Sequence, residues 1–260
     1  MVVAGRMLNR RAFASVLALV FFMAACSSAP QIPPHFEAFE RIPIRTVDVK
    51  GQLMAYLDVG QGEPVILLHG FGGSMWQWEH QQQPLSTEFR VITPDLIGSG
   101  LSAKPDIEYR PDQLLDYFLG FMDALQIRQA TLVGNSMGAG LVIGMALAPP
   151  DRVSRLVLIG GFPANVRECL TSPTIQRALD TPAPSWLVSF GNWLFGGVMI
   201  ESVLKEIVHD PALLTPAVIE RSNRNRQRPG LIPPLMTVRD TLPLWETGFA
   251  TRIGEICHRR

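Results

Sequence analysis

The sequence predicts an α/β protein with a mainly parallel sheet. Two observations lead to this fold class: short apolar runs are bounded by turn residues, and helical patterns separate the later runs. The chain has 260 residues, 47% of them hydrophobic, and only 3 Cys, so a core can form without a disulfide scaffold. Lys plus Arg and Asp plus Glu are both 23. This balance excludes the net positive charge that is typical of nucleic-acid-binding proteins, and we expect no nucleic-acid partner.

The first 25 residues predict an export signal. Arg6, Arg10 and Arg11 precede an apolar run over 12–25, which as a helix would span about 21 Å and is too short to cross a bilayer. Small residues directly before Cys26 resemble the lipobox of bacterial lipoproteins. The resemblance implies cleavage before Cys26, acylation of its thiol and anchoring of an exported protein to a membrane. The alternative is an ordinary signal peptide whose cysteine is incidental. Residues 26–43, rich in Ser, Pro and Gln, predict a tether.

The predicted core covers 44–161 and alternates strands with helices. A hairpin at Lys50-Gly51 joins the first two strands in antiparallel fashion. Helical patterns over 112–125 and 137–147 follow the fourth and fifth strands, and Pro149-Pro150 closes the second. The predicted strands are 44–49, 53–59, 64–69, 89–94, 130–135 and 153–160.

A serine between glycines follows the fifth predicted strand. The segment Gly134-Asn135-Ser136-Met137-Gly138 comes directly before a helical run. Small residues two positions before and after Ser136 are what a tight strand-to-helix turn requires, because a side chain there would meet the neighbouring backbone. Such a turn presents the serine alone at the end of the strand. This pattern predicts a nucleophile elbow.

A glycine-rich loop follows the third predicted strand, in Leu68-His69-Gly70-Phe71-Gly72-Gly73. Glycines allow backbone N–H groups to face a ligand, as an oxyanion hole requires. Together with 94–105, these segments resemble the α/β-hydrolase family, closely over about 44–161 and more loosely over 162–256. The resemblance implies that Ser136 is the nucleophile and that the N–H groups of Phe71 and Met137 bind the oxyanion. Haloalkane dehalogenases and epoxide hydrolases of this family carry Asp at the elbow, so serine points to acyl transfer.

Two other polar residues near these motifs have structural roles in the family pattern. By resemblance, His69 shapes the glycine-rich loop and Asp95 braces the turn at 98–100. The five histidines show no H-x-x-x-H spacing and no paired cysteines accompany them, so we expect neither a metal site nor a cofactor.

Residues 162–249 resemble the helical cap that the family inserts after its sixth strand. Trp186, Phe190 and Trp193 share one predicted helix face. We expect them to pack the cap on the sheet, or alternatively to line an apolar pocket over Ser136. The arginine-rich segment 221–228 predicts a solvated cap surface.

The family places the triad acid after its seventh strand and the triad histidine after its eighth. Here 250–256 looks like the start of strand seven, so we expect strands seven and eight to be missing, as in a C-terminally truncated chain whose triad acid and histidine are unknown. His258 follows Ser136 but stands at the terminus.

The sequence therefore predicts a lipoprotein with the α/β-hydrolase fold, acting through Ser136 on a small apolar ester or similar acyl substrate. Without the triad acid and histidine, we expect this chain to hydrolyse esters thousands of times more slowly than a complete relative. Carbon–carbon bond hydrolases and cofactor-free haloperoxidases share the S-M-G elbow and are alternatives. A non-catalytic surface or binding lipoprotein on the same scaffold is another.

Overall fold

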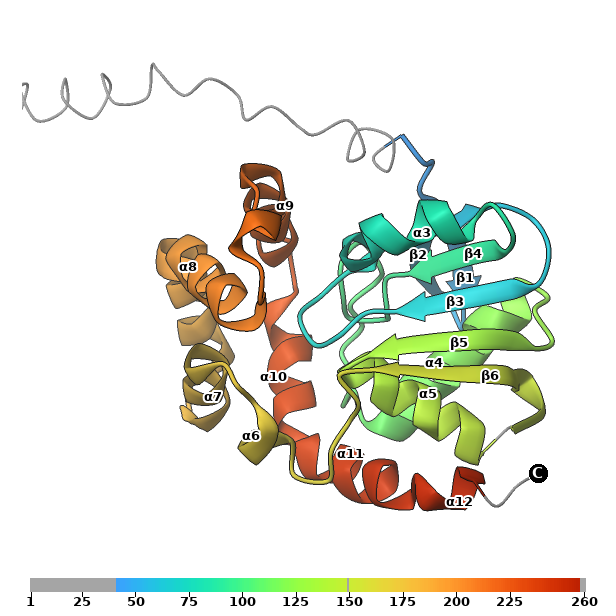
Figure 1. Cartoon of the computed structure of the whole chain (residues 1–260). Helices are drawn as coiled ribbons and strands as arrows, with labels where there is room; N and C mark the ends of the chain where they lie inside the picture. The colour runs from blue at the N-terminus through green and yellow to red at the C-terminus, as the bar shows by residue number, and fades with distance from the viewer. Residues whose placement is uncertain (1–40, 149, 258–260) are drawn as a thin grey trace, which may run out of the picture. The chain divides into compact units, whose positions relative to one another are not determined.

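The computed structural model describes residues 41–148 and 150–257. The predicted signal peptide, Cys26, most of the tether and His258 lie outside these residues. The described chain contains one six-stranded sheet in the order β1-β2-β4-β3-β5-β6 (Figure 1). β1 pairs with β2 and β2 with β4 in antiparallel fashion, whereas β4, β3, β5 and β6 are parallel. The predicted fold class is confirmed.

Each predicted strand is present with its ends within one residue of the expected position. The hairpin turn is also confirmed: Lys50 and Gly51 both adopt positive φ, and Gly51 N donates to Asp48 Oδ1 at 3.0 Å. The strands are β1 (Arg45–Val49), β2 (Gln52–Val59), β3 (Pro64–Leu68), β4 (Arg90–Pro94), β5 (Ala130–Asn135) and β6 (Val153–Ile159).

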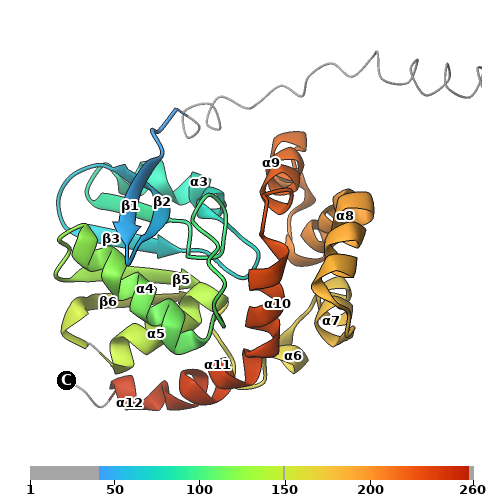
Figure 2. The same cartoon turned by 180° about the vertical axis from the view of Figure 1, so that it is seen from behind.

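Helices cover both faces of the sheet. The two predicted core helices, α4 (Pro111–Ala124) and α5 (Met137–Leu147), pack on one face and enclose the larger apolar cluster, which includes Phe118 and Leu141 (Figure 2). On the other face, the 3-10 helix η1 (Met75–Trp78) and α3 (Glu79–Leu85) cover a smaller cluster around Trp78 and Val91. Every residue of α5, the helix that follows β5, is buried.

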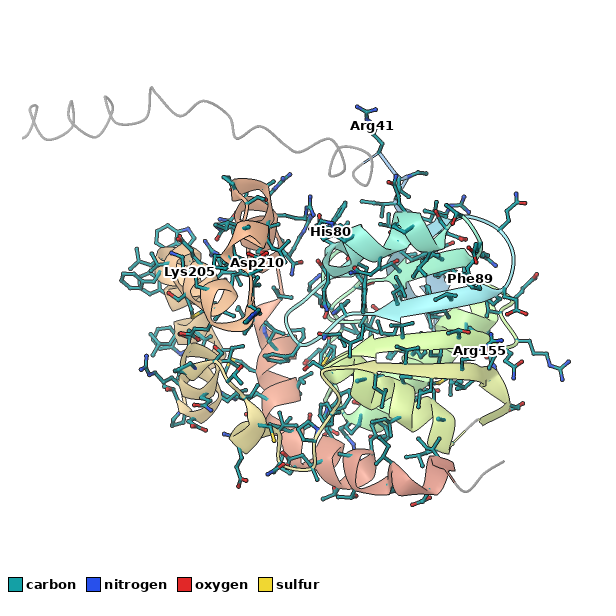
Figure 3. The ribbon with its side chains drawn as sticks, in the orientation of Figure 1. Arg41, His80, Phe89, Arg155, Lys205 and Asp210 are labelled. Atoms are coloured by element: carbon teal, nitrogen blue, oxygen red, sulfur yellow. The ribbon has the colours of Figure 1, made fainter. Side chains whose placement is uncertain are left out.

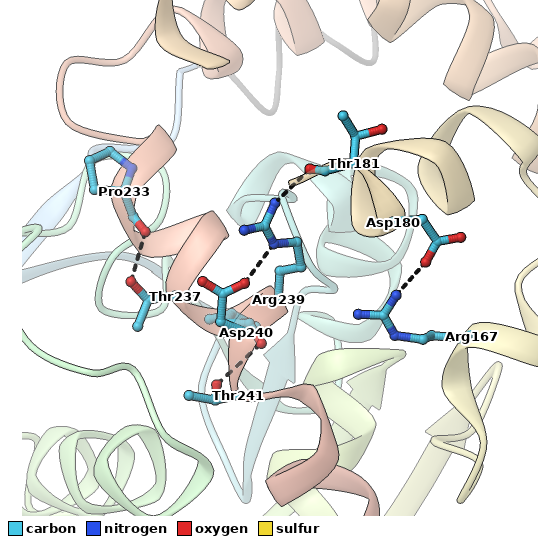
Figure 4. Close-up of polar contacts among 9 residues, drawn as sticks. Arg167, Asp180, Thr181, Pro233, Thr237, Arg239, Asp240 and Thr241 are labelled. Atoms are coloured by element: carbon cyan, nitrogen blue, oxygen red, sulfur yellow. Dashed lines mark hydrogen bonds and ion pairs between the residues drawn. The ribbon is translucent and has the colours of Figure 1, made fainter. Parts of the chain in front are cut away.

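After β6 the chain is helical. Figures 1 and 2 show α6 to α10 beside the edge of the sheet where the parallel strands end. Polar contacts join these helices: Arg239 on α10 donates to the Thr181 carbonyl at 3.3 Å, and Arg167 pairs with Asp180 (Figure 4). The elements are α6 (Val166–Cys169), α7 (Pro173–Asp180), α8 (Ser185–Ile207), η3 (Pro211–Leu213), α9 (Pro216–Arg226), α10 (Ile232–Asp240) and α11 (Leu242–Gly248).

The expectation that 250–256 begins a seventh strand is wrong. This segment forms η4 (Ala250–Arg252) and α12 (Gly254–Cys257). Local contacts favour the helical form, because Thr251 Oγ1 donates to the Thr247 carbonyl at 3.0 Å and Arg252 pairs with Glu255 at 2.8 Å. Ile253, the apolar residue in the middle of this segment, is exposed and does not enter the core.

An aromatic cluster on α5 joins the two ends of the cap region. Phe162, which follows β6, lies 5.7 Å from the Trp245 ring of α11, and Trp245 lies 5.9 Å from Phe249. Glycines on α5 make room for these rings. A Cβ at Gly140 would lie 3.1 Å from Trp245, and one at Gly144 only 2.7 Å from Phe249.

β6 forms one edge of the sheet. Arg155 points away from the sheet (Figure 3), and Val157 and Ile159 on the same face are both more than two fifths exposed. The opposite face of the strand packs against the core through Leu156 and Leu158.

Candidate active site

Ser136 occupies a strained turn between β5 and α5. Its backbone has φ 51° and ψ −115°, a region that residues with a side chain rarely adopt. Packing enforces this conformation: a Cβ at Gly134 would lie 2.3 Å from the Gly138 carbonyl oxygen, and one at Gly138 would lie 2.4 Å from the Leu68 carbonyl oxygen. The strand-to-helix turn predicted from the glycine spacing is therefore present in the structure.

The Ser136 side chain is exposed at the end of β5. Its backbone N–H donates to the Ile159 carbonyl at 3.1 Å, which ties the turn to β6. Gly70 lies directly beside it, since a Cβ there would be 3.4 Å from Ser136 Cβ. Among the residues that the structure describes, Ser136 Oγ has no hydrogen-bond partner. The hydroxyl thus has no histidine or carboxylate of the described residues bonded to it.

The loop after β3 forms a turn closed by Gly73 N, which donates to the Gly70 carbonyl at 3.0 Å. Gly70 N is engaged with Gln77 Oε1 at 3.1 Å. Within the described residues, the N–H of Phe71 has no acceptor. Met137 is the first residue of α5, where a backbone N–H has no acceptor within its own helix. The two N–H groups predicted to bind an oxyanion are therefore both available, one on each segment that flanks Ser136.

His69 is fully buried beneath this loop. Its Nδ1 lies 2.8 Å from the Gly70 carbonyl, and its Nε2 accepts from Leu96 N–H at 3.1 Å, which fixes the neutral ring with the proton on Nδ1. Burial lowers the pKa of His69, and the nearby Asp95 only partly offsets this effect. Both ring nitrogens are used in shaping the loop, as the family resemblance implied.

Asp95 braces the neighbouring turn. Its carboxylate accepts from Met75 N at 2.6 Å and from Leu101 N at 2.7 Å. Gly100 passes so close that an added Cβ would lie 2.0 Å from Asp95 Oδ2. Burial raises the pKa of Asp95, while His69 and the two backbone donors act in the opposite direction. This contact set holds the 98–100 turn, as expected, and leaves the carboxylate engaged away from Ser136.

Helix α9 of the cap region contacts the glycine-rich loop. Asn225 Nδ2 donates to the carbonyl oxygens of Gly72 at 3.1 Å and of Gly73 at 3.4 Å, and the Asn225 side chain is buried. One turn earlier, Arg221 pairs with Glu79 on α3, both side chains being 9% exposed, and its guanidinium lies 5.4 Å from the Trp76 ring. The loop that carries Phe71 is therefore held from above by the cap region.

These contacts correct the expectation that 221–228 is a solvated surface. Arg221 and Asn225 are buried, Arg226 is half-buried and bonded to α8, and Arg224 is exposed. Ala217, Arg221 and Asn225 recur every four residues and form the buried face of α9. Sequence analysis missed this face because two of its three residues are polar, although the spacing itself was visible.

The expected packing of Trp186, Phe190 and Trp193 between cap and sheet is wrong. The three side chains are 68%, 55% and 74% exposed. A cavity of about 650 Å³ lies between α8 and the segment joining α9 to α10, and Trp193 lines it together with Asn192 and Arg228. Ser136 is not among its lining residues, and neither are Trp186 and Phe190. Of the three aromatic residues, Trp193 is therefore the one that lines this cavity.

Among the described residues, no cluster of three or more His, Cys, Asp or Glu side chains could hold a metal ion.

Residues 63–197 match the family model for the alpha/beta hydrolase fold. The chain belongs to the α/β-hydrolase family. This α/β hydrolase is 42% identical over 107 residues to the 2-hydroxymuconate semialdehyde hydrolase of Pseudomonas sp. (strain CF600), a match covering 40% of this chain and 38% of that protein. It is 38% identical over 120 residues to the 2-hydroxy-6-oxo-6-(2'-aminophenyl)hexa-2,4-dienoic acid hydrolase of Metapseudomonas resinovorans, covering 45% and 41%. The chain thus spans about two fifths of the length of the curated relatives it matches.

Solved structures agree with this α/β-hydrolase assignment. The meta-cleavage product hydrolase from Pseudomonas fluorescens IP01 superposes with a TM-score of 0.60 at 29% identity, covering 74% of this chain and 67% of that one. An epoxide hydrolase from Vigna radiata superposes with a TM-score of 0.65 at 25% identity, covering 83% and 76%.

Proposed function

We propose that this α/β hydrolase cleaves a carbon–carbon bond next to a ketone or aldehyde carbonyl in a small hydroxy-dienoic acid, using Ser136 as the nucleophile. The observation that carries the proposal is the strained, exposed Ser136 between two available backbone donors, Phe71 N–H and Met137 N–H. The relatives named as hydrolases of 2-hydroxymuconate semialdehyde and of a 2-hydroxy-6-oxo-hexadienoic acid support this substrate class over the simple ester expected from the sequence.

The chemistry follows from the geometry of the site. Ser136 Oγ attacks the carbonyl carbon, and the carbonyl oxygen becomes an oxyanion that accepts hydrogen bonds from Phe71 N–H and Met137 N–H. The positive end of α5 lies at the same point and favours that negative charge. Collapse of the adduct breaks the carbon–carbon bond. The bonding electron pair leaves with the dienoate fragment, which takes up the proton that Ser136 lost, and water hydrolyses the remaining acyl-serine. Among the described residues none contacts Ser136 Oγ as a base, so we assign only the nucleophile and the two oxyanion donors.

Matched serine variants test this proposal. The purified protein is assayed on a 2-hydroxy-6-oxo-hexa-2,4-dienoate, whose conjugated absorbance is lost on cleavage, and on a short nitrophenyl ester. Ser136→Ala is expected to remove whatever dienoate turnover the native protein shows, because the attacking hydroxyl is lost, whereas Ser86→Ala, at a half-buried serine at the end of α3, leaves it unchanged.

Equal rates for the native protein and Ser136→Ala would refute the proposal. Hydrolysis of the ester alone, dependent on Ser136, would refute the carbon–carbon substrate and establish the serine esterase predicted from the sequence. Binding of the dienoate without turnover would favour a non-catalytic binding protein.

We also propose that the protein is exported and anchored to a bacterial membrane through acylated Cys26, on the strength of the apolar run over 12–25 and the small residues before this cysteine. Mass spectrometry of the N-terminal peptide tests the anchor. A diacylglyceryl group on a chain that starts at Cys26 is expected. An unmodified N-terminus there would overturn the proposal.

A further inference from the structure

The outer face of α8 is unusually apolar for a surface helix. From Ser185 to Ile200 the helix contains no charged residue. Spacings of three and four residues place the large apolar side chains in one stripe. Six members of this α8 stripe are 44–74% exposed: Trp186, Leu187, Phe190, Trp193, Leu194 and Val198. An exposed apolar surface of this extent on one helix indicates an interaction site.

By length and composition α8 could cross a membrane, since it has 23 residues and only 6% of its most apolar window is buried. Its polar contacts hold it within the cap region instead. Asn192 exchanges hydrogen bonds with Arg226 of α9, at 3.2 Å and 2.7 Å. Near the other end, Glu206 accepts from Thr174 Oγ1 of α7 at 2.7 Å. Insertion across a bilayer would break both sets of hydrogen bonds. In the folded protein, α8 therefore has only one side free for contact with a partner.

We propose that the α8 stripe lies in the surface of a lipid bilayer, with the helix parallel to the membrane plane. The proposal rests on the lipid anchor proposed at Cys26. Fourteen residues lie between Cys26 and Arg41, the first described residue, and a fully extended chain of this length can span about 50 Å. An anchored body is therefore confined near the bilayer, where a weak apolar contact acts at a high effective concentration.

The composition of the α8 stripe fits contact with a lipid bilayer. Trp side chains favour the boundary between headgroups and acyl chains, because the ring is apolar and its N–H is polar. Trp186 and Trp193 lie seven residues apart on the same face of the helix and can enter the boundary together. The stripe ends where charge begins: Glu201 and Lys205 form an exposed ion pair, and Figure 3 labels Lys205 at that end of α8. By their spacing from Leu194 and Val198, Glu201 and Lys205 continue the same side of the helix. In a helix that lies flat, their charged groups would lie at the level of the lipid headgroups.

Quenching of Trp fluorescence by brominated lipid tests the proposal. The full-length protein is reconstituted in phosphatidylcholine vesicles with or without bromine on the acyl chains. Trp186 and Trp193 are two of five Trp residues, so brominated lipid is expected to remove up to about two fifths of the emission. Trp186→Phe/Trp193→Phe, which keeps the stripe aromatic, should abolish that loss, whereas Trp76→Phe on η1 should retain it.

A second pair of variants reports on the contact itself. Val198→Glu places a charge in the stripe and should reduce the quenching, whereas Leu213→Glu, on η3 and 54% exposed, should not. Circular dichroism confirms that each variant is folded.

Absence of quenching, or quenching that persists in Trp186→Phe/Trp193→Phe, would overturn the proposal. So would a lipid-independent dimer, measured by sedimentation, that Val198→Glu dissociates, because the stripe would then bind a second copy of the chain. The mass of the N-terminal peptide reports separately on the anchor, and dienoate turnover reports separately on the proposed hydrolase activity.

Discussion

Asn225 of the cap region donates its side-chain amide to the Gly72 carbonyl, 3.1 Å away and 153 positions earlier in the chain. The next peptide carbonyl, that of Gly73, lies 3.4 Å from the same nitrogen. This hydrogen bond connects α9 to the turn that contains Phe71, whose N–H we propose as an oxyanion donor for Ser136. The position of one proposed oxyanion donor therefore depends on a helix that the family inserts outside the sheet.

Asn225→Ala is expected to slow the chemical step more than it weakens substrate binding, because Phe71 N–H loses the support that fixes its direction. Loss of these hydrogen bonds should also lower the free energy of unfolding by about 1 kcal/mol. The measurements are kcat and KM on the dienoate or ester that the native protein hydrolyses. Gln227→Ala, an exposed position at the end of the same helix, is the control. An unchanged kcat in Asn225→Ala would contradict this positioning role.

Gly138→Ala should destabilise the fold and disrupt the elbow. The new methyl group would lie 2.4 Å from the Leu68 carbonyl oxygen and 2.8 Å from that of His69, and backbone on both sides limits relaxation. We expect a loss of about 1–3 kcal/mol or more in the free energy of unfolding, together with loss of Ser136 labelling by a fluorophosphonate. The matched control is Gly191→Ala in α8, where nothing lies within 4 Å of the added carbon. It should stabilise the protein by about 0.5–1 kcal/mol.

The depressed pKa of His69 predicts a loss of stability on acidification. Because folding lowers the pKa of His69, the unfolded chain binds a proton at this residue more readily than the folded protein does. The stability is therefore complete above the unfolded pKa of about 6.5 and is lost as the pH falls below that value. Urea unfolding between pH 8 and pH 5 should therefore show a slope that His69→Gln reduces. At pH 8, His69→Gln should cost about 1–3 kcal/mol, because Leu96 N–H loses its acceptor. His80→Gln, at an exposed site, should retain the slope; an equal slope in native protein and His69→Gln would contradict the assignment.

Breaking the ion pair between Arg221 and Glu79 should be costly, because it leaves one charge buried without its partner. We expect Arg221→Ala to lower the free energy of unfolding by about 3–5 kcal/mol. Arg155→Ala breaks the exposed pair with Glu63 and should cost at most about 1 kcal/mol. Replacing both buried partners, as in Arg221→Met/Glu79→Met, should recover much of the loss. Similar costs for Arg221→Ala and Arg155→Ala would show that the buried pair does not hold α9 in place.

The sequence predicted the sheet well because its strands are bounded by local signals. The Lys50-Gly51 turn and the glycines around Ser136 act through steric limits that extend over only a few residues. The cap region was harder to predict, since the partners of its residues are distant in sequence. Arg221 and Asn225 are polar and gave no apolar periodicity, yet a buried carboxylate and two backbone carbonyls make their burial favourable.

The apolar face of α8 was misjudged for the opposite reason. Trp186 and Trp193 have the composition of a core, so the sequence predicted that they pack inward or line a pocket. Asn192 and Arg226 turn the other face of the helix toward α9 and leave the aromatic face outside. Periodicity shows which side chains share a face, but it does not show what that face meets.

The aromatic cluster on α5 gives both ends of the cap region one attachment point on the core. The chain leaves the core at Phe162 and returns at Trp245 and Phe249, and these rings meet over Gly140 and Gly144. Because departure and return share one attachment point, a larger side chain at Gly140 or Gly144 would disturb both ends of the cap region at once. The hydrogen bond from Asn225 to Gly72 is a separate attachment, so the cap region is fastened to the core at two places that single substitutions can release independently.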